Sequence, residues 1–233
     1  MKILLTGGSG KLGTELQKII KCYAPNRKTL DITNPHSFLD FYGRRDIETV
    51  IHAAAYTDVP KCEINRRGAI DINIIGTKNV ATNFLKTRIV YISTDYVYSG
   101  KGNHKETEQP EPFNFYGFTK LAGEEFMDIN KDLIIRTSFK PSKWEYERAF
   151  NDIFTSADYI DVIAKDIAML AESNLTGIIN VGTERKTIYD LAHKRNAHVK
   201  EMSKNEIKNV KLPFDISMNL DKLNNVKKKM EER

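Results

Sequence analysis

The sequence predicts an α/β protein with a doubly wound parallel sheet and a small, reduced C-terminal lobe. Short apolar runs alternate along the chain with stretches of helical periodicity, which is a pattern typical of βαβ units. A glycine-rich turn separates the first apolar run from the first helical stretch. The alternation becomes irregular after Thr137 and again after Thr183, and these two irregular segments indicate the small lobe.

The predicted strands are continuous apolar runs, which are typical of strands buried on both faces of a sheet. They cover residues 2–6, 49–54, 88–93, 132–137 and 177–181. One helix is predicted directly after the glycine turn, with an apolar face made of Leu12, Leu16, Ile19 and Ile20. Further helices are predicted over residues 35–44, 69–86, 116–129 and 160–172.

The composition is that of an ordinary folded domain and excludes several classes of protein. The 233 residues are 40% hydrophobic and 29% charged, which excludes disordered, collagen-like and small disulfide-rich chains. No apolar run approaches the roughly 18 residues of a membrane span, so we expect no membrane partner. Cys22 and Cys62 lack a C-x-x-C spacing and are expected to be free thiols of a cytoplasmic protein.

The net charge of +5 does not by itself indicate a nucleic-acid partner. Residues 200–233 carry nine Lys and Arg against six Asp and Glu, so we interpret this tail as a solvated, frayed helix of mixed sign. A mild positive field equally suits a small anionic ligand such as a nucleotide. The five histidines show no metal-ligand spacing, so we expect no metal site.

The turn over residues 6–13 has the glycine spacing G-x-x-G-x-x-G between a predicted strand and a predicted helix. In a dinucleotide site, Gly7 allows the tight turn, Gly10 allows the pyrophosphate to approach, and Gly13 lets the helix pack on the strand. A purely structural glycine turn is the alternative. A P-loop is excluded because no Gly-Lys-Ser/Thr closes the turn.

The residues after this helix favour NADP(H) over NAD(H) as the cofactor. A dinucleotide fold usually carries an acidic residue about twenty positions after the glycine turn, where it binds the adenosine ribose. Residues 22–28 contain no acid, and Arg27, with Lys28, stands where a basic group would accept a 2′-phosphate. The alternatives are a surface arginine in a shortened loop, and NAD(H).

We expect residues 1–138 and 156–182 to form an NADP-binding Rossmann domain, and residues 139–155 and 183–233 the small substrate-binding lobe.

A tyrosine, a lysine and a strand-end hydroxyl suggest a catalytic site. Tyr116 and Lys120 stand four residues apart and therefore share one helix face. A neighbouring ammonium lowers the pKa of a phenol from its ordinary value of about 10, which suits proton exchange in catalysis. Ser93 and Thr94 end a predicted strand, where a hydroxyl can hold a substrate carbonyl against the tyrosine. The order of glycine turn, strand-end hydroxyl and Tyr-Lys pair is much less frequent by chance than any one of them.

Several stretches carry a resemblance that covers about the first 140 residues. They are TGGSGKLGTEL from Thr6, LDITNP from Leu30, HAAAYTDVPKCE from His52, NIIGTKNVA from Asn73, ISTDYVYSG from Ile92, FNFYGFTKLAGEE from Phe113 and IIRTSF from Ile134. With them the sequence resembles the extended short-chain dehydrogenase/reductases, and within these the dTDP-4-dehydrorhamnose reductase branch. The sequence departs from the branch at Phe139, where the branch usually has a tryptophan beside the substrate sugar.

The resemblance implies a role for each matching residue. Tyr116 would protonate the C4 ketone oxygen while nicotinamide delivers hydride, Lys120 would hold the nicotinamide ribose, and Thr94 would bind the carbonyl. The cofactor would contact Gly7, Gly10, Lys11 and Leu12 at its pyrophosphate, Asp31 and Ile32 at its adenine, and the wall formed by Ala53, Ala54, Ala55 and Tyr56. The sugar would lie near Thr57, Asp95, Tyr96 and Phe139. Trp144 would either replace the lost tryptophan or pack within the lobe.

The resemblance therefore implies NADP(H)-dependent reduction of a nucleotide-linked 4-keto-6-deoxy sugar to a rhamnose-type product. One alternative is an epimerase or dehydratase acting on a similar nucleotide sugar. Another is a non-catalytic, NADP-binding regulatory subunit, which the shortened substrate lobe suggests. The expected partners are a nucleotide-sugar substrate and, in a homodimer, a second copy of the chain.

Overall fold

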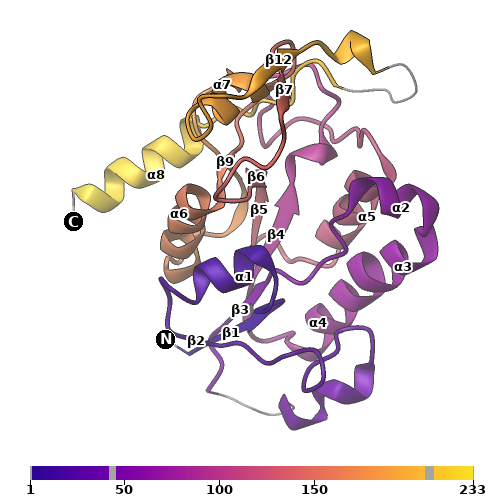
Figure 1. The fold of residues 1–233 in the computed structure, drawn as a ribbon. Helices are drawn as coiled ribbons and strands as arrows, with labels where there is room; N and C mark the ends of the chain where they lie inside the picture. Colours follow the sequence, from indigo (N-terminus) through magenta and orange to yellow (C-terminus); the bar gives the residue numbers. More distant parts are fainter. Residues whose placement is uncertain (1, 42–45, 208–212, 233) are drawn as a thin grey trace.

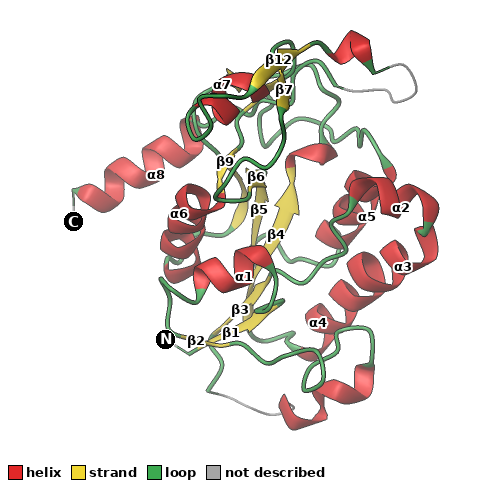
Figure 2. Cartoon of the chain, viewed as in Figure 1, coloured by secondary structure: helices red, strands yellow, loops and turns green. Residues whose placement is uncertain are grey.

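Six parallel strands form the central sheet in a computed structural model that describes residues 2–41, 46–207 and 213–232 (Figures 1 and 2). In spatial order the strands are β10 (Gly177–Val181), β5 (Leu133–Thr137), β4 (Arg88–Thr94), β3 (Thr49–His52), β1 (Ile3–Thr6) and β2 (Cys22–Tyr23). The predicted parallel α/β fold and its five strands are confirmed. The sequence analysis missed β2, which is only two residues long and pairs with β1 through Ile3 and Leu4.

The order of the strands reverses beside β1, and this position determines where a ligand can bind. The chain passes from β1 to β2 on one side and then returns to β3 on the other side of β1. The carboxyl ends of β1 and β3 lie side by side, because Thr6 pairs with His52. In an open α/β sheet this reversal leaves a crevice outside the carboxyl ends of the strands, which is the usual ligand site.

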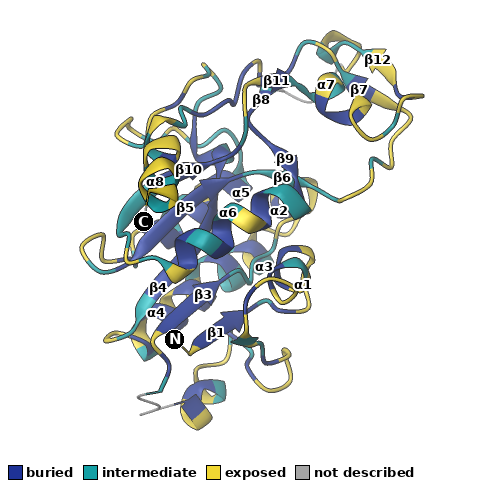
Figure 3. Ribbon diagram, turned by 90° about the vertical axis from the view of Figure 1, so that its left-hand side faces the viewer, coloured by how far each residue is buried: buried dark blue, intermediate teal, exposed yellow. Residues whose placement is uncertain are grey.

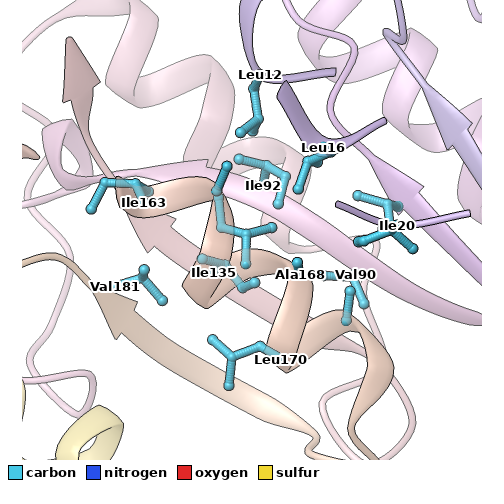
Figure 4. Close-up of a cluster of buried hydrophobic side chains, with 14 of the residues drawn as sticks. Leu12, Leu16, Ile20, Val90, Ile92, Ile135, Ile163, Ala168, Leu170 and Val181 are labelled. Atoms are coloured by element: carbon cyan, nitrogen blue, oxygen red, sulfur yellow. The ribbon is translucent and has the colours of Figure 1, made fainter. Parts of the chain in front are cut away.

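Helices cover both faces of the sheet, so that the strands are buried on both sides (Figures 1 and 3). One face packs against α1 (Lys11–Leu16) and α6 (Ile160–Glu172), with Leu16, Ile92 and Ile163 in the shared core (Figure 4). The other face packs against the 3₁₀ helix Pro35–Phe41 and α4 (Thr77–Asn83). This arrangement explains why the strands read as continuous apolar runs.

The observed helices confirm the predicted positions with three differences. Helix α6 has the predicted bounds, and α5 (Phe115–Glu124) ends five residues before the predicted end. The predicted helix 69–86 is divided into α3 (Arg66–Ile70), a π-helical turn (Asp71–Gly76) and α4. The predicted helix 35–44 is a 3₁₀ helix as far as Phe41, and residues 42–44 lie outside the described residues.

The expected apolar face of α1 is correct for Leu12, Leu16 and Ile20, which are buried, and wrong for Ile19. Ile19 is 45% exposed because α1 ends at Leu16, so the helical period no longer applies there. The sequence analysis also missed α2 (Val59–Ile64), where Asp58 caps the helix by accepting a hydrogen bond from the Lys61 amide.

Three short strand pairs and a helix lie beyond the carboxyl edge of the sheet. The pairs are β6 (Phe139–Lys140) with β9 (Asp158–Tyr159), β7 (Arg148–Phe150) with β12 (Lys200–Met202), and β8 (Phe154–Thr155) with β11 (Lys186–Thr187); the helix is α7 (Ile188–His193). The last helix, α8 (Asp221–Glu231), returns to the sheet and buries Leu223 in the core beside α6. The division of the chain into two domains stays a prediction.

Candidate functional site

The glycine turn after β1 lies so close to the end of β3 that side chains are excluded from it. Gly7 has a φ of +74°, and a Cβ there would lie 2.6 Å from the backbone nitrogen of Ala54. A Cβ on Gly13 would overlap the carbonyl oxygen of Gly7. The Gly10 amide donates a hydrogen bond of 2.9 Å to that same oxygen. The first and last glycines are therefore required by geometry, as the spacing predicts.

Two adjoining cavities meet at this turn, and both are lined by Gly7, Gly10, Ala53 and Ala55. The first cavity, of about 430 Å³, runs from the turn to the ends of β4 and β5. Of the predicted site residues it is also lined by Lys11, Leu12, Gly13, Thr57, Thr94, Tyr96, Tyr116 and Phe139. The second cavity, of about 250 Å³, is lined by Arg27, Asp31, Ile32 and Ala54. The predicted residues Tyr56, Asp95 and Lys120 line neither cavity.

The second cavity brings Arg27 and Asp31 onto one wall. Arg27 Nε donates to Asp31 Oδ2 at 3.2 Å, and the arginine side chain is 73% exposed. Asp31 also accepts a 2.7 Å hydrogen bond from the Thr33 hydroxyl, which orients its carboxylate. The predicted 2′-phosphate residue therefore lies beside the predicted adenine residue, where it can reach a ligand in this cavity.

Thr94 and Tyr116 meet in the first cavity from two different elements. Thr94 is the last residue of β4, and Tyr116 lies in the first turn of α5, which is capped by Asn114 through a 2.8 Å bond from the Gly117 amide. A side chain on Gly117 would overlap the carbonyl oxygen of Tyr96, so this glycine allows α5 to approach the end of β4. Both residues line the cavity. The pair can hold one carbonyl oxygen between two hydroxyls.

The pKa of Tyr116 is raised, whereas the sequence predicts that Lys120 lowers it. Burial, together with the Asp95 carboxylate, raises the pKa of the Tyr116 phenol well above its ordinary value, and the Thr94 side chain opposes this rise. The predicted lowering of that pKa by Lys120 is therefore wrong for this structure, because desolvation dominates. Burial also lowers the pKa of Lys120 to about 7, and its ammonium lies 4.0 Å from the centre of the Tyr91 ring.

Asn73, in the π-helical turn, joins the cavity wall to α5, and the sequence analysis did not assign it a role. Its side-chain oxygen accepts from the Tyr56 amide at 2.7 Å, and its nitrogen donates to the Tyr56 carbonyl at 3.1 Å and to the Thr119 hydroxyl at 2.9 Å. The asparagine is completely buried. It therefore fixes the chain after β3 relative to the helix that carries Tyr116. Only the stretch NIIGTKNVA pointed to this segment.

The surroundings of His52 and Trp144 indicate that both residues stabilise the fold. His52 is completely buried between the Thr6 hydroxyl, 2.7 Å from Nδ1, and the Thr77 hydroxyl, 3.0 Å from Nε2. Trp144 packs against Ala149 and its neighbours in the lobe and does not line the first cavity, so packing within the lobe is the correct alternative. Within the described ranges, no cluster of His, Cys, Asp and Glu is arranged to hold a metal ion, and no helix has the length and apolarity to cross a bilayer.

A sheet that reverses its order beside a glycine turn, with Thr94 and Tyr116 meeting at its carboxyl edge, is the arrangement of the extended short-chain dehydrogenase/reductases. Within that class, the chain belongs to the family described as the RmlD substrate binding domain, which matches residues 1–165. The predicted resemblance is thereby confirmed.

Named relatives agree with this family. The chain is 37% identical over 151 residues to the spore coat polysaccharide biosynthesis protein SpsK of Bacillus subtilis (strain 168), covering 59% of this chain and 53% of that protein. It is 29% identical over 180 residues to dTDP-4-dehydrorhamnose reductase of Aggregatibacter actinomycetemcomitans, covering 71% of this chain and 61% of that protein. The chain therefore spans less than two thirds of the length of these curated relatives.

Solved structures extend the likeness over almost the whole chain. A dTDP-4-dehydrorhamnose reductase from Bacillus anthracis str. Ames, in complex with NADP, has a TM-score of 0.85 and 29% identity, covering 97% of this chain and 92% of that chain. A hypothetical dTDP-4-dehydrorhamnose reductase from Sulfolobus tokodaii has a TM-score of 0.84 and 32% identity, covering 97% and 94%. The similarity of fold therefore extends beyond residues 1–165, which the family matches.

Proposed function

We propose that the protein reduces a nucleotide-linked 4-keto-6-deoxy sugar with NADP(H). The observation that carries this proposal is the pair of hydroxyls, Thr94 and Tyr116, on the wall of a cavity that begins at the glycine turn. The names of the relatives, and the NADP held by the structure from Bacillus anthracis, support it.

The residues of the two cavities fit a dinucleotide. Gly7 and Gly13 stand where a Cβ would collide with the backbone, so the turn can lie against a pyrophosphate. Arg27 lines the second cavity and offers a cation to a 2′-phosphate. Lys11 adds a positive charge to the first cavity. When bound, NADPH would supply the hydride for the sugar carbon.

Tyr116 supplies the proton in this reaction. The phenol is protonated at neutral pH, because its ordinary pKa of about 10 already lies well above 7 and burial raises it further. The protonated phenol is the form needed to protonate the oxygen of a ketone undergoing reduction. The Thr94 hydroxyl holds the same oxygen and orients the carbonyl towards the phenol. Lys120 follows one turn later on the helix, and its buried amine lies beside the Tyr91 ring.

Reduction accounts for the cavity better than epimerisation or dehydration. These alternatives need further acid or base groups that contact the sugar. Among the described residues, no Asp or Glu lines the first cavity, and Asp95 lies buried behind its wall. Two hydroxyls are sufficient for a reduction in which the cofactor supplies the hydride.

The test is the loss of NADPH absorbance on mixing the protein with dTDP- and UDP-linked 4-keto-6-deoxy sugars. We expect Tyr116→Phe to reduce kcat by about 10²-fold to 10⁴-fold, because it removes the general acid. Its Kd for NADPH, measured by fluorescence titration, should remain that of the unsubstituted protein. Tyr146→Phe, on an exposed tyrosine of the lobe, is the matched control and should retain full turnover. Turnover by Tyr116→Phe at the unsubstituted rate would refute the mechanism, and no turnover of any of these sugars would refute the function.

A further inference from the structure

Lys140 is a charged residue of the first cavity that the proposed reduction does not use. It ends β6, whose two residues pair with β9 through Phe139–Asp158 and Lys140–Tyr159. Among the described residues, Lys11 and Lys140 are the only charged side chains that line this cavity. Lys11 begins α1 beside the glycine turn, whereas Lys140 follows the end of β5 by three positions. Lys140 is therefore the cation at the sugar end.

The ammonium of Lys140 lacks an acceptor within the described part of the chain. Among the described residues, the charged group that acts on this ammonium is the Asp95 carboxylate, and no ion pair joins the two side chains. Burial lowers the pKa of Lys140, while the Asp95 carboxylate favours its charged form. Lys140 is partly exposed at the cavity wall, so a ligand oxygen in the cavity can reach its ammonium and gain a charge-assisted hydrogen bond.

Thr137 adds a second polar group without a partner to the same wall. Its hydroxyl oxygen is buried and has no hydrogen-bond partner, and its residue lines the cavity. Thr137 pairs with Thr94 across β5 and β4, so the two residues lie directly opposite each other on neighbouring strands. If Thr94 holds the ketone oxygen, a group held by Thr137 and Lys140 belongs to a neighbouring carbon of the same sugar.

Asp95 places a negative charge behind this wall. It is completely buried, its Oδ1 accepts from the Thr94 hydroxyl at 3.2 Å, and its Oδ2 has no hydrogen-bond partner. The groups that act on its carboxylate are the charge of Lys140 and the side chains of Thr94 and Ser138. Because Asp95 does not line the cavity, it acts on the ligand through Lys140.

We propose that Lys140, together with the Thr137 hydroxyl, forms a substrate-binding subsite for the hydroxyl on the carbon next to the ketone. In a 4-keto-6-deoxy sugar, C5 carries a methyl group and the ring oxygen, so the only hydroxyl on a carbon next to the ketone is the 3-hydroxyl. The subsite therefore selects sugars that retain this hydroxyl over their 3-deoxy analogues. This inference rests on the proposed function.

The experiment compares steady-state kinetics of dTDP-4-keto-6-deoxyglucose and its 3-deoxy analogue in two variants. Lys140→Met keeps the length of the side chain and removes the charge, and Lys140→Arg keeps the charge. Because a hydrogen bond to a charged group is lost, we expect Lys140→Met to raise KM for the parent sugar about tenfold or more. The preference for the parent sugar over the analogue should disappear in Lys140→Met and return in part in Lys140→Arg.

Two measurements separate this role from general damage. The Kd for NADPH should be the same in both variants and in the unsubstituted protein, because Lys140 lies away from the glycine turn. Lys143→Met, on an exposed lysine three residues later, is the matched control and should leave KM unchanged. An unchanged KM in Lys140→Met, or equal use of the two sugars by the unsubstituted protein, would overturn the subsite and leave the proposed reduction intact. Failure of the unsubstituted protein to turn over these sugars and every other dTDP- or UDP-linked 4-keto-6-deoxy sugar overturns both.

Discussion

The buried ion pair between Arg136 and Glu124 should dominate the stability of the site, and Glu124→Met tests this. Arg136, on β5, donates to both carboxylate oxygens of Glu124, at 3.1 and 2.7 Å, and to the Tyr98 hydroxyl at 3.1 Å. Glu124 is in the last turn of α5 and also accepts from the Ser93 hydroxyl. The pair therefore ties the helix that carries Tyr116 to the two strands that end at the cavity.

The expected loss follows from the burial of both partners. The side chains of Arg136 and Glu124 are only 2% and 4% exposed, so removal of one leaves a desolvated charge without its counter-ion. Such a change costs about 3–5 kcal/mol of the free energy of unfolding. For a chain of this size, we expect a decrease in Tm of about 6–20 °C. Urea unfolding at pH 7 and a thermal melt, both followed by circular dichroism, measure the two quantities.

Two further variants show whether the loss arises from the unpaired charge. The double variant Glu124→Met with Arg136→Met removes both charges and should recover much of the lost stability, because an apolar pair can replace a buried ion pair. Arg67→Ala breaks an exposed pair with Asp71, of 2.9 Å, and should cost at most about 1 kcal/mol. A loss below about 1 kcal/mol in Glu124→Met, or a double variant less stable than either single one, would refute this reasoning.

Three other properties follow from single residues. Arg27→Ala should reduce the preference for NADPH over NADH by about tenfold, because an exposed cation beside the 2′-phosphate is lost; paired Kd titrations test it, and an unchanged ratio contradicts it. Burial lowers the pKa of His52 to about 3, below its unfolded value of about 6.5. The folded protein therefore keeps the ring neutral, and its free energy of unfolding decreases as the pH falls below about 6.5. Between pH 7 and pH 5 the loss should be about 2 kcal/mol in urea unfolding, and it should disappear in His52→Gln but persist in the exposed-site control His193→Gln. Burial raises the pKa of Cys62 to about 11, so dithionitrobenzoate at pH 8 should modify the partly exposed Cys22 first; equal rates would disprove the burial argument.

The sheet was predictable from the sequence because its strands are buried on both faces. Burial on both sides removes polar alternation, and each resulting apolar run maps onto one strand. The π-helical turn at Asp71–Gly76 was not predictable, because it depends on the hydrogen bonds that Asn73 makes with Tyr56 and Thr119. These partners lie 17 and 46 positions away, so no local period records them.

Some residues of the candidate site were likewise predictable from the sequence, and others were not. Thr94 and Tyr116 could be identified because their chemistry is carried by residue type, by position at a strand end and by spacing on a helix. Lys140 could not, because its place in the cavity depends on the pairing of β6 with β9, residues that lie far apart in the chain. The pKa of Tyr116 could not be predicted either. The spacing to Lys120 indicates a cation, but not that the phenol is desolvated or that Asp95 lies near it.

The raised pKa of Tyr116 affects the proton transfer in the proposed reduction. A phenol with a lowered pKa serves equally well as an acid or as a base near neutral pH, whereas a desolvated phenol beside a carboxylate holds its proton. Ketone reduction consumes a proton, so the phenol must be protonated before hydride transfer; a raised pKa meets this need but also makes the proton harder to release. Asp95 and Lys140 both influence the protonation of Tyr116: Asp95 acts on it directly, and Lys140 acts on it through Asp95. The carboxylate of Asp95 disfavours the phenolate, and its own pKa is raised by burial to about 7 while the charge of Lys140 opposes that rise.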